Sequence, residues 1–326
     1  MNKIRWGILG TGKITGALIR GIRASEDGEL VAIASRDLAR AEKHAAENQI
    51  SRAYGSYEEL LADRDIDAIY NPLPNSLHAP WTIAAAKAGK HILCEKPLAP
   101  TPAECARMIA AAKRYRVVLM EAFMYRFHPQ SAKIKELITS GTIGKLRQVH
   151  SSFTFSLSDL SNVRLSKPLA GGAVMDVGCY CINLSRYLFG QEPSEVFAAA
   201  HFGKQSGVDE QLIGLLKFRD GGVASFDCSF QVAFRWGAEA VGSSGRIVIP
   251  TPWKPANPST ITLTSGGKSE EVIVAGDDPY KLQVDHFNAV VRRKAKLVLP
   301  PSDGLANARV MQALLTSARK NRVVKL

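Results

Sequence analysis

The sequence predicts two domains: an N-terminal doubly wound parallel (Rossmann) sheet of the α/β class, and an α+β domain with an open, mostly antiparallel sheet. As far as about residue 122, apolar runs of strand length alternate with helical patterns, which is typical of parallel βαβ units. Beyond that point short strands separated by turns predominate, which favours antiparallel pairing. The 326 residues suffice for two domains. We assign 1–122 to dinucleotide binding and 123–326 to substrate binding and oligomerisation.

Each element of the first domain follows from its local pattern. Residues 4–10 are an apolar run that ends in glycine, and the residues after Thr15 are apolar at helical spacing. A strand, a glycine turn and a helix are therefore expected in that order. Similar patterns predict strands at 30–34, 68–70, 91–94 and 117–120, and helices at 38–48, 57–63, 79–88 and 102–115.

The second domain is expected to contain a succession of strands and a few helices. Apolar and polar residues alternate in strand fashion at 145–156, 194–201, 211–217, 223–230, 235–242, 245–249 and 260–263. Helical patterns cover 130–140, 179–188, 278–293 and 304–320. Four prolines between positions 250 and 258 predict an extended surface loop.

The turn after the first strand predicts a dinucleotide site. Gly10 would permit the tight turn, and Gly12 would let the backbone approach the pyrophosphate at the N-terminus of the next helix. The third position of the dinucleotide-binding pattern G-x-G-x-x-G/A is occupied by Thr15. This departure from Gly or Ala is tolerated because the residue there needs only to be small. A plain tight turn is the alternative interpretation. We expect the cofactor along the five turn residues Gly10, Thr11, Gly12, Lys13 and Ile14.

The end of the second strand bears on which dinucleotide binds. An NAD site places an acid there for the ribose hydroxyl, whereas this chain has Ser35, Arg36 and Asp37. Arg36 suits a 2′-phosphate, because a guanidinium pairs with phosphate in a fork geometry. Asp37 is placed to cap the following helix. The sequence therefore favours NADP(H) over NAD(H). The alternative is that Arg36 is an ordinary surface residue and Asp37 serves NAD.

Composition excludes several classes of protein. The net charge is +12, but the basic residues are dispersed and no nucleic-acid-binding motif is present, so we expect no nucleic-acid partner. No run reaches the ~18 apolar residues that span a bilayer, and no basic and apolar leader opens the sequence. No His, Cys, Asp or Glu cluster has metal-ligand spacing, so no metal is expected. Five cysteines, an odd number, fit buried thiols in a reducing cytoplasm.

Four segments carry a resemblance to one family of oxidoreductases. They are the glycine turn, the run 71–78 (NPLPNSLH), Glu95-Lys96-Pro97 and the run 171–180 (GGAVMDVGCY). Nearly the whole chain resembles the family of glucose-fructose oxidoreductase, inositol dehydrogenase and MocA-like proteins. The run 120–129 (MEAFMYRFHP), and a tyrosine at position 180 where most of the family has histidine, narrow the match. They are similar to the branch of dimeric dihydrodiol dehydrogenase and NADP-dependent D-xylose dehydrogenase.

The resemblance implies specific roles for several residues. Lys96 corresponds to the family's catalytic lysine and Tyr180 to its catalytic tyrosine, and the Lys96–Pro97 bond is often cis in this family. It also implies a homodimer, or a tetramer, formed through the open sheet. The matched positions imply further cofactor contacts from Asn71, Pro72, Leu73, Asn75, His78, Glu95 and Lys96.

The chemistry of these residues agrees with the resemblance. Oxidation of an alcohol needs a base for the hydroxyl proton, and tyrosine, with an ordinary pKa of about 10, is a poor one at neutral pH. A nearby lysine cation stabilises the phenolate, so Lys96 would assist Tyr180. The alternatives are a core aromatic at Tyr180 and a surface lysine at Lys96. Asp176 either orients a substrate hydroxyl or caps a helix, and we include it with the catalytic candidates.

The predicted substrate is a sugar or a small polyol or diol, with hydride transfer to or from the nicotinamide. Arg126 would contact a substrate hydroxyl or carboxylate, or else form a structural ion pair. The predicted substrate-binding set is Met124, Arg126, Phe155, Asp176, Tyr180 and Tyr280. Alternatives are aldose–aldose or trans-dihydrodiol chemistry on the same scaffold, and a non-catalytic protein that senses the cofactor.

Overall fold

The computed structural model describes residues 3–326, which divide into two units. The first unit contains the residues up to 124 together with 278–305, and the second contains 125–277 and 306–326. The predicted continuous domain 123–326 therefore does not hold for 278–305. The reason is α8 (Pro279–Val291), which packs against α1 (Thr15–Ala24) and returns to the first sheet through Asn288. The side chain of Asn288 accepts a hydrogen bond from Trp6 Nε1 at 3.1 Å.

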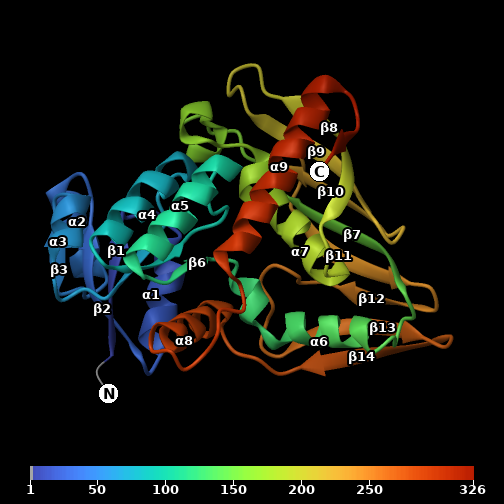
Figure 1. Cartoon of the computed structure of the whole chain (residues 1–326), viewed down its shortest axis with the longest axis horizontal. Coiled ribbons are helices and arrows are strands. Elements are labelled where there is room, and N and C mark those ends of the chain that lie inside the picture. Colours follow the sequence, from blue (N-terminus) through green and yellow to red (C-terminus); the bar gives the residue numbers. More distant parts are fainter. Residues whose placement is uncertain (1–2) are drawn as a thin grey trace. The chain divides into compact units, whose positions relative to one another are not determined.

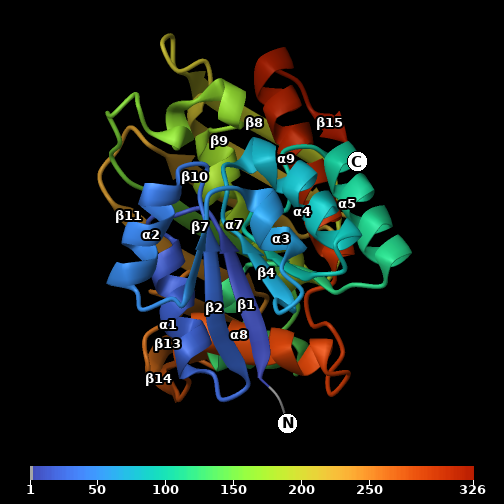
Figure 2. The ribbon, with the colours of Figure 1, turned by 90° about the vertical axis from the view of Figure 1, so that its left-hand side faces the viewer.

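The first unit is built on a parallel sheet, as predicted. Its six strands lie in the order β3-β2-β1-β4-β5-β6, and every neighbouring pair is parallel. Figure 2 shows β2, β1 and β4 side by side at the centre of this sheet. The strand order reverses between β1 and β4, which is where doubly wound sheets bind their ligands. The strands are β1 (Ile4–Leu9), β2 (Gly28–Ala34), β3 (Arg52–Tyr54), β4 (Ala68–Asn71), β5 (His91–Cys94) and β6 (Leu119–Glu121).

Several helices of the first unit begin at side-chain caps of the residue types that are favoured at helix N-termini. Asp37, Ser56 and Thr101 each accept a backbone hydrogen bond from the first turn of the helix that follows. In Figure 1, α4 and α5 pack against each other, and α1 lies against α8. Between α1 and β6, the helices of this unit are α2 (Leu38–Glu47), α3 (Tyr57–Ala62), η1 (Asn75–Leu77), α4 (His78–Lys87) and α5 (Pro102–Tyr115).

The second unit is built on a nine-stranded sheet in the order β14-β13-β12-β11-β7-β10-β9-β8-β15. Only β10 and β7 pair in parallel, so the sheet is mostly antiparallel, as predicted. The strands are β7 (Leu146–Thr154), β8 (Pro193–Phe202), β9 (Asp209–Phe218), β10 (Val223–Ser229), β11 (Arg235–Gly242), β12 (Gly245–Ile249), β13 (Ser259–Ser265), β14 (Lys268–Val274) and β15 (Val324–Lys325).

Helices cover one face of this nine-stranded sheet. α7 packs on β7 and β10, and the hydroxyl of Ser317 in α9 accepts a hydrogen bond from the β8 backbone. On the opposite face alternate residues of β9 are exposed, among them Ile213 and Leu215. The remaining helical segments are η2 (Met124–Phe127), α6 (Pro129–Thr139), η3 (Val163–Leu165), η4 (Lys167–Leu169), η5 (Val174–Gly178), α7 (Cys179–Phe189) and α9 (Pro301–Lys320), which joins the second unit at residue 306.

The proline-rich segment 250–258 is a loop between β12 and β13 with most of its residues exposed, as its composition predicted, but one of its large side chains is buried. Trp253, within it, is only 1% exposed and donates a hydrogen bond from Nε1 to the carbonyl of Ser152 at 3.2 Å. The prolines shape the backbone, but the large apolar side chain determines where the segment packs. Elsewhere, all five cysteines are free and buried. Across residues 3–326, no helix has the length and apolar character needed to cross a bilayer.

Candidate active site

The glycine turn has the geometry of a phosphate-binding turn. Gly10 has φ +89°, a conformation that favours glycine, and its N–H donates to the carbonyl of Ala34 at 2.7 Å. A Cβ at Gly12 would meet no protein atom within 4 Å, so the backbone there is open to a ligand. No side chain caps α1, which follows the turn. The buried Thr15 donates from its hydroxyl to the carbonyl of Gly12 at 2.7 Å and closes the turn.

The residues after β2 form a short turn into α2. Ser35 is buried, and its hydroxyl accepts a hydrogen bond from the N–H of Asp37. Asp37 caps α2 by accepting from the N–H of Arg40 at 3.3 Å, which is the role that the sequence predicted. Arg36 is exposed and hydrogen-bonds to Tyr57, and it has no carboxylate partner among the residues that the structure describes. Burial raises the pKa of Tyr57, while the charges of Arg36 and Arg40 oppose that shift.

The run 71–78 folds back on itself through two buried side chains. Asn71 donates from Nδ2 to the carbonyl of His78 and to the hydroxyl of Thr82, both at 3.2 Å. The two ring nitrogens of His78 lie 2.7 Å from the carbonyl oxygen of Leu73 and 2.9 Å from that of Pro97. Burial lowers the pKa of His78, and its bonds to the two carbonyls oppose the shift. Asn71 and His78 therefore shape this loop from within, whereas Pro72 and Asn75 are half-buried.

The Lys96 loop is held on both sides by buried groups. Before it, the carboxylate of Glu95 accepts from the hydroxyl of Tyr70 at 2.6 Å and from the N–H of Lys96 at 3.2 Å. After it, Glu121 at the end of β6 accepts from the N–H of Leu98 at 2.7 Å. The Lys96–Pro97 bond is cis, as the resemblance implied. The backbone of Lys96 is thus fixed, and its side chain is half-buried.

Two residues predicted for the substrate pocket belong to the first unit. Met124 is the last residue of that unit's first stretch and is 5% exposed. Tyr280, in the first turn of α8, is 8% exposed, and the backbone of α1 approaches it so closely that a Cβ at Gly21 would lie 2.9 Å from its carbonyl carbon. Burial raises the pKa of Tyr280, and the charge of Glu95 raises it further. Tyr280 and the Glu95 loop are therefore near neighbours.

The second unit surrounds Tyr180 with aromatic rings. Tyr180 lies in the first turn of α7 and is 7% exposed. The rings of Phe153, Trp253 and Tyr125 have their centroids 5.7, 5.7 and 6.0 Å from its own. We call Tyr125, Phe153, Tyr180 and Trp253 the aromatic cluster. Sequence reasoning missed three of its members, because η2, β7 and the proline-rich segment meet only in the folded unit. The alternation in β7 was the one available signal, for Phe153.

Asp176 is not a simple helix cap. It lies in the π-helical turn η5, one turn before Tyr180, and forms an ion pair with Arg164, whose Nε lies 2.6 Å from Asp176 Oδ2. π-helical turns are rare and are found often at functional sites. The carboxylate is thereby oriented by a guanidinium from η3. The capping interpretation is replaced by an ion pair, whereas the predicted contact with substrate stays a prediction.

Arg126 stacks on α7. Its guanidinium lies 3.8 Å from the ring centroid of Tyr187, and its Nη1 donates to Asn183 Oδ1 at 3.2 Å. Among the described residues no carboxylate pairs with it, so the structural ion pair weighed in the sequence is not found. Asn183 Oδ1 also accepts from the hydroxyl of Tyr125 at 2.5 Å, which ties Arg126 to the aromatic cluster. Phe155, the other predicted residue, packs against Phe230, with 5.1 Å between the ring centroids.

The structure divides the predicted site residues between its two units. The first unit carries the glycine turn, Ser35, Arg36, the 71–78 loop, Lys96, Met124 and Tyr280, and the second carries Arg126, Phe155, Asp176 and Tyr180. No group of three or more potential metal ligands occurs among residues 3–326.

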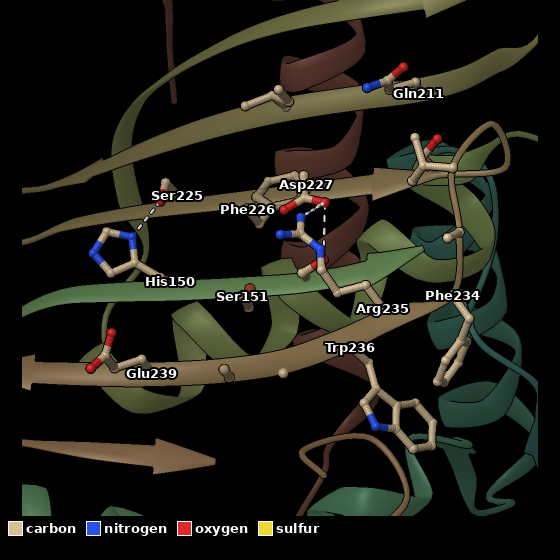
Figure 3. Close-up of a pocket in the computed structure, with 17 residues that line it drawn as sticks. His150, Ser151, Gln211, Ser225, Phe226, Asp227, Phe234, Arg235, Trp236 and Glu239 are labelled. Atoms are coloured by element: carbon tan, nitrogen blue, oxygen red, sulfur yellow. Dashed lines mark hydrogen bonds and ion pairs between the residues drawn. The ribbon is translucent and has the colours of Figure 1, made fainter. Parts of the chain in front are cut away.

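A separate cavity of about 830 Å³ lies on the open face of the nine-stranded sheet (Figure 3). It is lined by residues of β7, β9, β10 and β11 and of the loop between β10 and β11, including His150, Asp227, Phe234, Arg235 and Trp236. Asp227 of β10 and Arg235 of β11 form an ion pair across β7, which lies between these two strands, and His150 is hydrogen-bonded to Ser225. None of the predicted site residues lines this cavity. The cavity is therefore distinct from the set of predicted site residues.

A glycine turn at the carboxyl end of the central strand β1 of a six-stranded parallel sheet, with a fixed lysine loop at the carboxyl end of β5, defines a dinucleotide-dependent oxidoreductase. The model of the GFO/IDH/MocA oxidoreductase family with an NAD-binding Rossmann fold matches residues 4–123, and the model of the family's C-terminal domain matches 131–248. The chain belongs to the GFO/IDH/MocA family and is an enzyme, an NAD(P)-dependent dehydrogenase or reductase.

Two curated relatives place the chain near the expected branch. D-xylose 1-dehydrogenase (NADP(+)) 2 of Haloferax volcanii is 37% identical over 325 residues, covering 98% of this chain and 99% of its own. Trans-1,2-dihydrobenzene-1,2-diol dehydrogenase of Mus musculus is 32% identical over 331 residues, covering 97% and 96%. The resemblance drawn from the sequence motifs is confirmed.

Two solved structures share the whole fold. Aldose-aldose oxidoreductase from Caulobacter crescentus, complexed with glycerol, matches with a TM-score of 0.93 at 29% identity over 100% of both chains. KijD10, a 3-ketoreductase from Actinomadura kijaniata in complex with NADP and TDP-benzene, matches with a TM-score of 0.91 at 28% identity over 97% of this chain and 98% of its own.

Proposed function

We propose that this enzyme transfers a hydride between NADP(H) and a CH–OH carbon of a sugar or of a small polyol or diol. The observation that carries the proposal is the fixed Lys96 loop, whose backbone is held by Glu95 on one side and by His78 and Glu121 on the other. Groups that act on a developing charge must be preorganised in this way. The names of the xylose and dihydrodiol dehydrogenases support the substrate class.

In the proposed mechanism Tyr180 exchanges a proton with the substrate hydroxyl, and Lys96 stabilises the phenolate form of Tyr180. The bound nicotinamide supplies the hydride acceptor or donor. Asp176, oriented by Arg164, accepts a hydrogen bond from a second substrate hydroxyl. Solved variants of the 3-ketoreductase replace one tyrosine by phenylalanine and one lysine by alanine or glutamate. The two replaced positions are separated by the same number of residues as Lys96 and Tyr180, which supports the pairing.

For the cofactor we propose NADP(H), held along the glycine turn and by the 71–78 loop and Glu95. The open backbone at Gly12 and the uncapped start of α1 fit a pyrophosphate. At the adenosine end, Arg36 has no carboxylate partner in the part of the chain that the structure describes, and a charge from Arg40 lies close by. Two guanidinium groups at this place fit a 2′-phosphate and would disfavour an acid-dependent NAD site.

Replacing Arg36 by alanine tests this preference. A charge-assisted hydrogen bond contributes about 1.5–3 kcal/mol, so KM for NADP is expected to rise about 10- to 100-fold while KM for NAD stays nearly unchanged. Arg107, exposed on α5, provides the matched control Arg107→Ala, which should alter neither value. An equal loss with both cofactors in Arg36→Ala would contradict the proposed phosphate contact.

For the substrate we propose that Met124, Arg126, Phe155 and Tyr280 join Asp176, Tyr180 and the aromatic cluster in forming the pocket walls. Aromatic faces suit the C–H faces of a sugar ring and also the ring of an aromatic diol. The cluster therefore supports a second candidate, trans-dihydrodiol oxidation, beside sugar oxidation. Aldose–aldose oxidoreduction, named for one structural neighbour, is the third form of the same chemistry.

A cofactor titration followed by a substrate screen tests the proposed function. NADPH and NADH are titrated separately by fluorescence, and absorbance of the nicotinamide is then followed with aldoses, keto-sugars, trans-diols and pairs of aldoses. We expect tighter binding of NADPH, with turnover of at least one member of the panel. Cofactor binding without turnover of any sugar or diol would contradict the proposed substrate class.

We also propose that the enzyme is a homodimer, formed through the open face of the nine-stranded sheet. On that face, beside the polar side chains that line the cavity, Ile213 and Leu215 of β9 are 53% and 51% exposed, and Phe234 just before β11 is 62% exposed. Exposed apolar patches of this kind mark interaction sites. A self-complementary face would join two copies about a twofold axis, and pairing of two such dimers would give a tetramer.

The variant Phe234→Glu tests this interface. A charge in place of this exposed ring is expected to convert the dimer to a monomer in light scattering, with the far-UV circular dichroism unchanged. Val298→Glu, which places the same charge at an equally exposed residue of the first unit, is the control and should remain dimeric. A dimer that persists in Phe234→Glu would exclude this face.

Finally, we propose a cytoplasmic location. Five free thiols, all buried and none paired among residues 3–326, are what a reducing compartment maintains.

A further inference from the structure

A buried carboxylate outside the predicted site holds the start of the helical segment that carries Tyr180. Asp209 is the first residue of β9 and is 3% exposed. Its Oδ2 accepts a hydrogen bond from the N–H of Val174 at 2.7 Å, and the carboxylate also receives the N–H of Ala173. These are the first N–H groups of the segment that runs through η5 into α7. No carbonyl earlier in a helix is available for them.

The backbone around Asp209 is shaped to admit the carboxylate. Gly172, immediately before the segment, has φ +124°, and a Cβ there would lie 2.3 Å from Asp209 Oδ1. Only glycine is tolerated at such a position. The N–H of Gly172 donates to the carbonyl of Arg164 at 2.8 Å, and Arg164 in turn binds Asp176. The cap and the Asp176 ion pair are therefore parts of one arrangement.

We propose that Asp209 is a positioning residue, whose carboxylate fixes the start of the helical segment and thereby the reacting geometry of Tyr180 and Asp176. The inference rests on the proposed roles of those two residues. A carboxylate at a helix N-terminus is favoured by charge-assisted hydrogen bonds and by the helix dipole. Asp176 follows Ala173 by three residues and Tyr180 follows it by seven, so displacement of the first turn moves both side chains. A misplacement of about 1 Å is enough to lower a rate about 100-fold.

The cap changes charge close to neutral pH. Burial raises the pKa of Asp209 to about 7, and the N–H groups of Val174 and Ala173 and the charge of Arg319 oppose that shift. The thiol of Cys228 on β10 also interacts with Asp209, and the thiols of Cys179 and Cys181 on α7 and the carboxylate of Asp227 interact in turn with Cys228. Burial raises the pKa of Cys228, so this thiol stays neutral where Asp209 titrates. The cap is therefore strongest above this pH and weakens as the pH falls below it.

The titration of Asp209 also makes the stability of the fold depend on pH. The folded pKa of Asp209 lies above its ordinary value of 3.8, so the folded state binds the proton more tightly than the unfolded state does. The stability that Asp209 contributes when protonated is therefore lost as the pH rises from about 4 to about 7. Asp209→Asn removes this dependence, so its Tm relative to the wild type is expected to rise with pH over that range.

Activity measurements on Asp209→Ala and Asp209→Asn test the positioning role. We expect Asp209→Ala to lower kcat about 10- to 100-fold with KM for NADP within about twofold of the wild type. Asparagine is as good a cap as aspartate, so Asp209→Asn should recover most of kcat at neutral pH. It should also lose the inflection near pH 7 in the kcat profile. Glu210→Ala, which removes the adjacent carboxylate of 8% exposure, is the control and should leave kcat unchanged.

A double-mutant cycle separates this inference from the proposed function. If Asp209 acts through Tyr180, Asp209→Ala should cause little further loss in a Tyr180→Phe background. An unchanged kcat in Asp209→Ala, or an equal proportional loss in both backgrounds, would overturn the positioning role while Tyr180→Phe remained impaired. Normal turnover in Tyr180→Phe alone would instead overturn the proposed function, and this inference with it. Asp209→Asn keeps the test decisive if Asp209→Ala does not fold.

Discussion

Replacing Tyr180 by phenylalanine is expected to lower kcat about 10²- to 10⁴-fold, the usual contribution of a positioned acid–base group. The ring remains, so its packing against Phe153, Trp253 and Tyr125 is kept and the fold should be unaffected. Only the phenolic hydroxyl is removed. Affinity for NADPH, measured by fluorescence titration, should stay within about twofold of the wild type, because the proposed cofactor contacts lie in the first unit.

The same helix offers a matched control for this variant. Tyr187 lies two turns further along α7, and its hydroxyl donates to the carbonyl of Ser131 at 3.2 Å. Tyr187→Phe makes the same chemical change without touching the proposed proton path, and kcat should remain close to that of the wild type. Wild-type turnover in Tyr180→Phe, or an equal loss in both variants, would remove Tyr180 from the mechanism.

Replacing Lys96 by alanine should also lower kcat about 10²-fold or more, for a different reason. Without the cation, the phenolate loses its electrostatic stabilisation, so oxidation should require a more alkaline solution. We therefore expect the rising limb of the pH profile for oxidation to move to higher pH in Lys96→Ala. Lys96→Arg restores a positive charge and should move the limb part of the way back. Steady-state rates across the pH range measure both effects.

Lys87→Ala controls for the simple loss of a lysine, because Lys87 is exposed in the last turn of α4. Its pH profile should overlay that of the wild type. If Lys96→Ala lost activity equally at every pH, then Lys96 would serve to bind cofactor or substrate and would not tune Tyr180. That outcome would be compatible with the proposed hydride transfer but would contradict the proposed role of Lys96 in proton transfer.

Most of the fold could be predicted because its strands and helices follow local rules. The strands 235–242 and 245–249 and the helix 102–115 have the predicted bounds. The strands that were missed have weak local signals. β3 is only three residues long, and β14 begins with a charged run, Lys268 to Glu271, that pairs with β13 across a two-glycine turn. The return of α8 to the first unit depends on tertiary packing, which a local pattern cannot show.

The same distinction between local motifs and tertiary packing applies to the candidate site. The glycine turn, the Asp37 cap and the Lys96 loop are contiguous motifs, and the positive φ of Gly10, the Asp37 cap and the cis Lys96–Pro97 bond are local features that such motifs indicate. Trp253 and Asp209 could not have been found in this way. Trp253 stands in a proline-rich segment that resembles surface, and Asp209 meets the Tyr180 segment only when β9 packs beside η5. Neither has a neighbour in sequence that indicates its role.

Transfer of deuterium from labelled NADPH tests the central claim most directly. The enzyme is incubated with carbonyl forms of candidate sugars and diols and with NADPH that carries deuterium on one or the other face of nicotinamide C4. Hydride transfer predicts that one product alcohol gains a single deuterium from one of the two labelled cofactors and none from the other, as read by mass spectrometry. Absence of deuterium from every product with both labels, under conditions where NADPH is bound, would contradict the account.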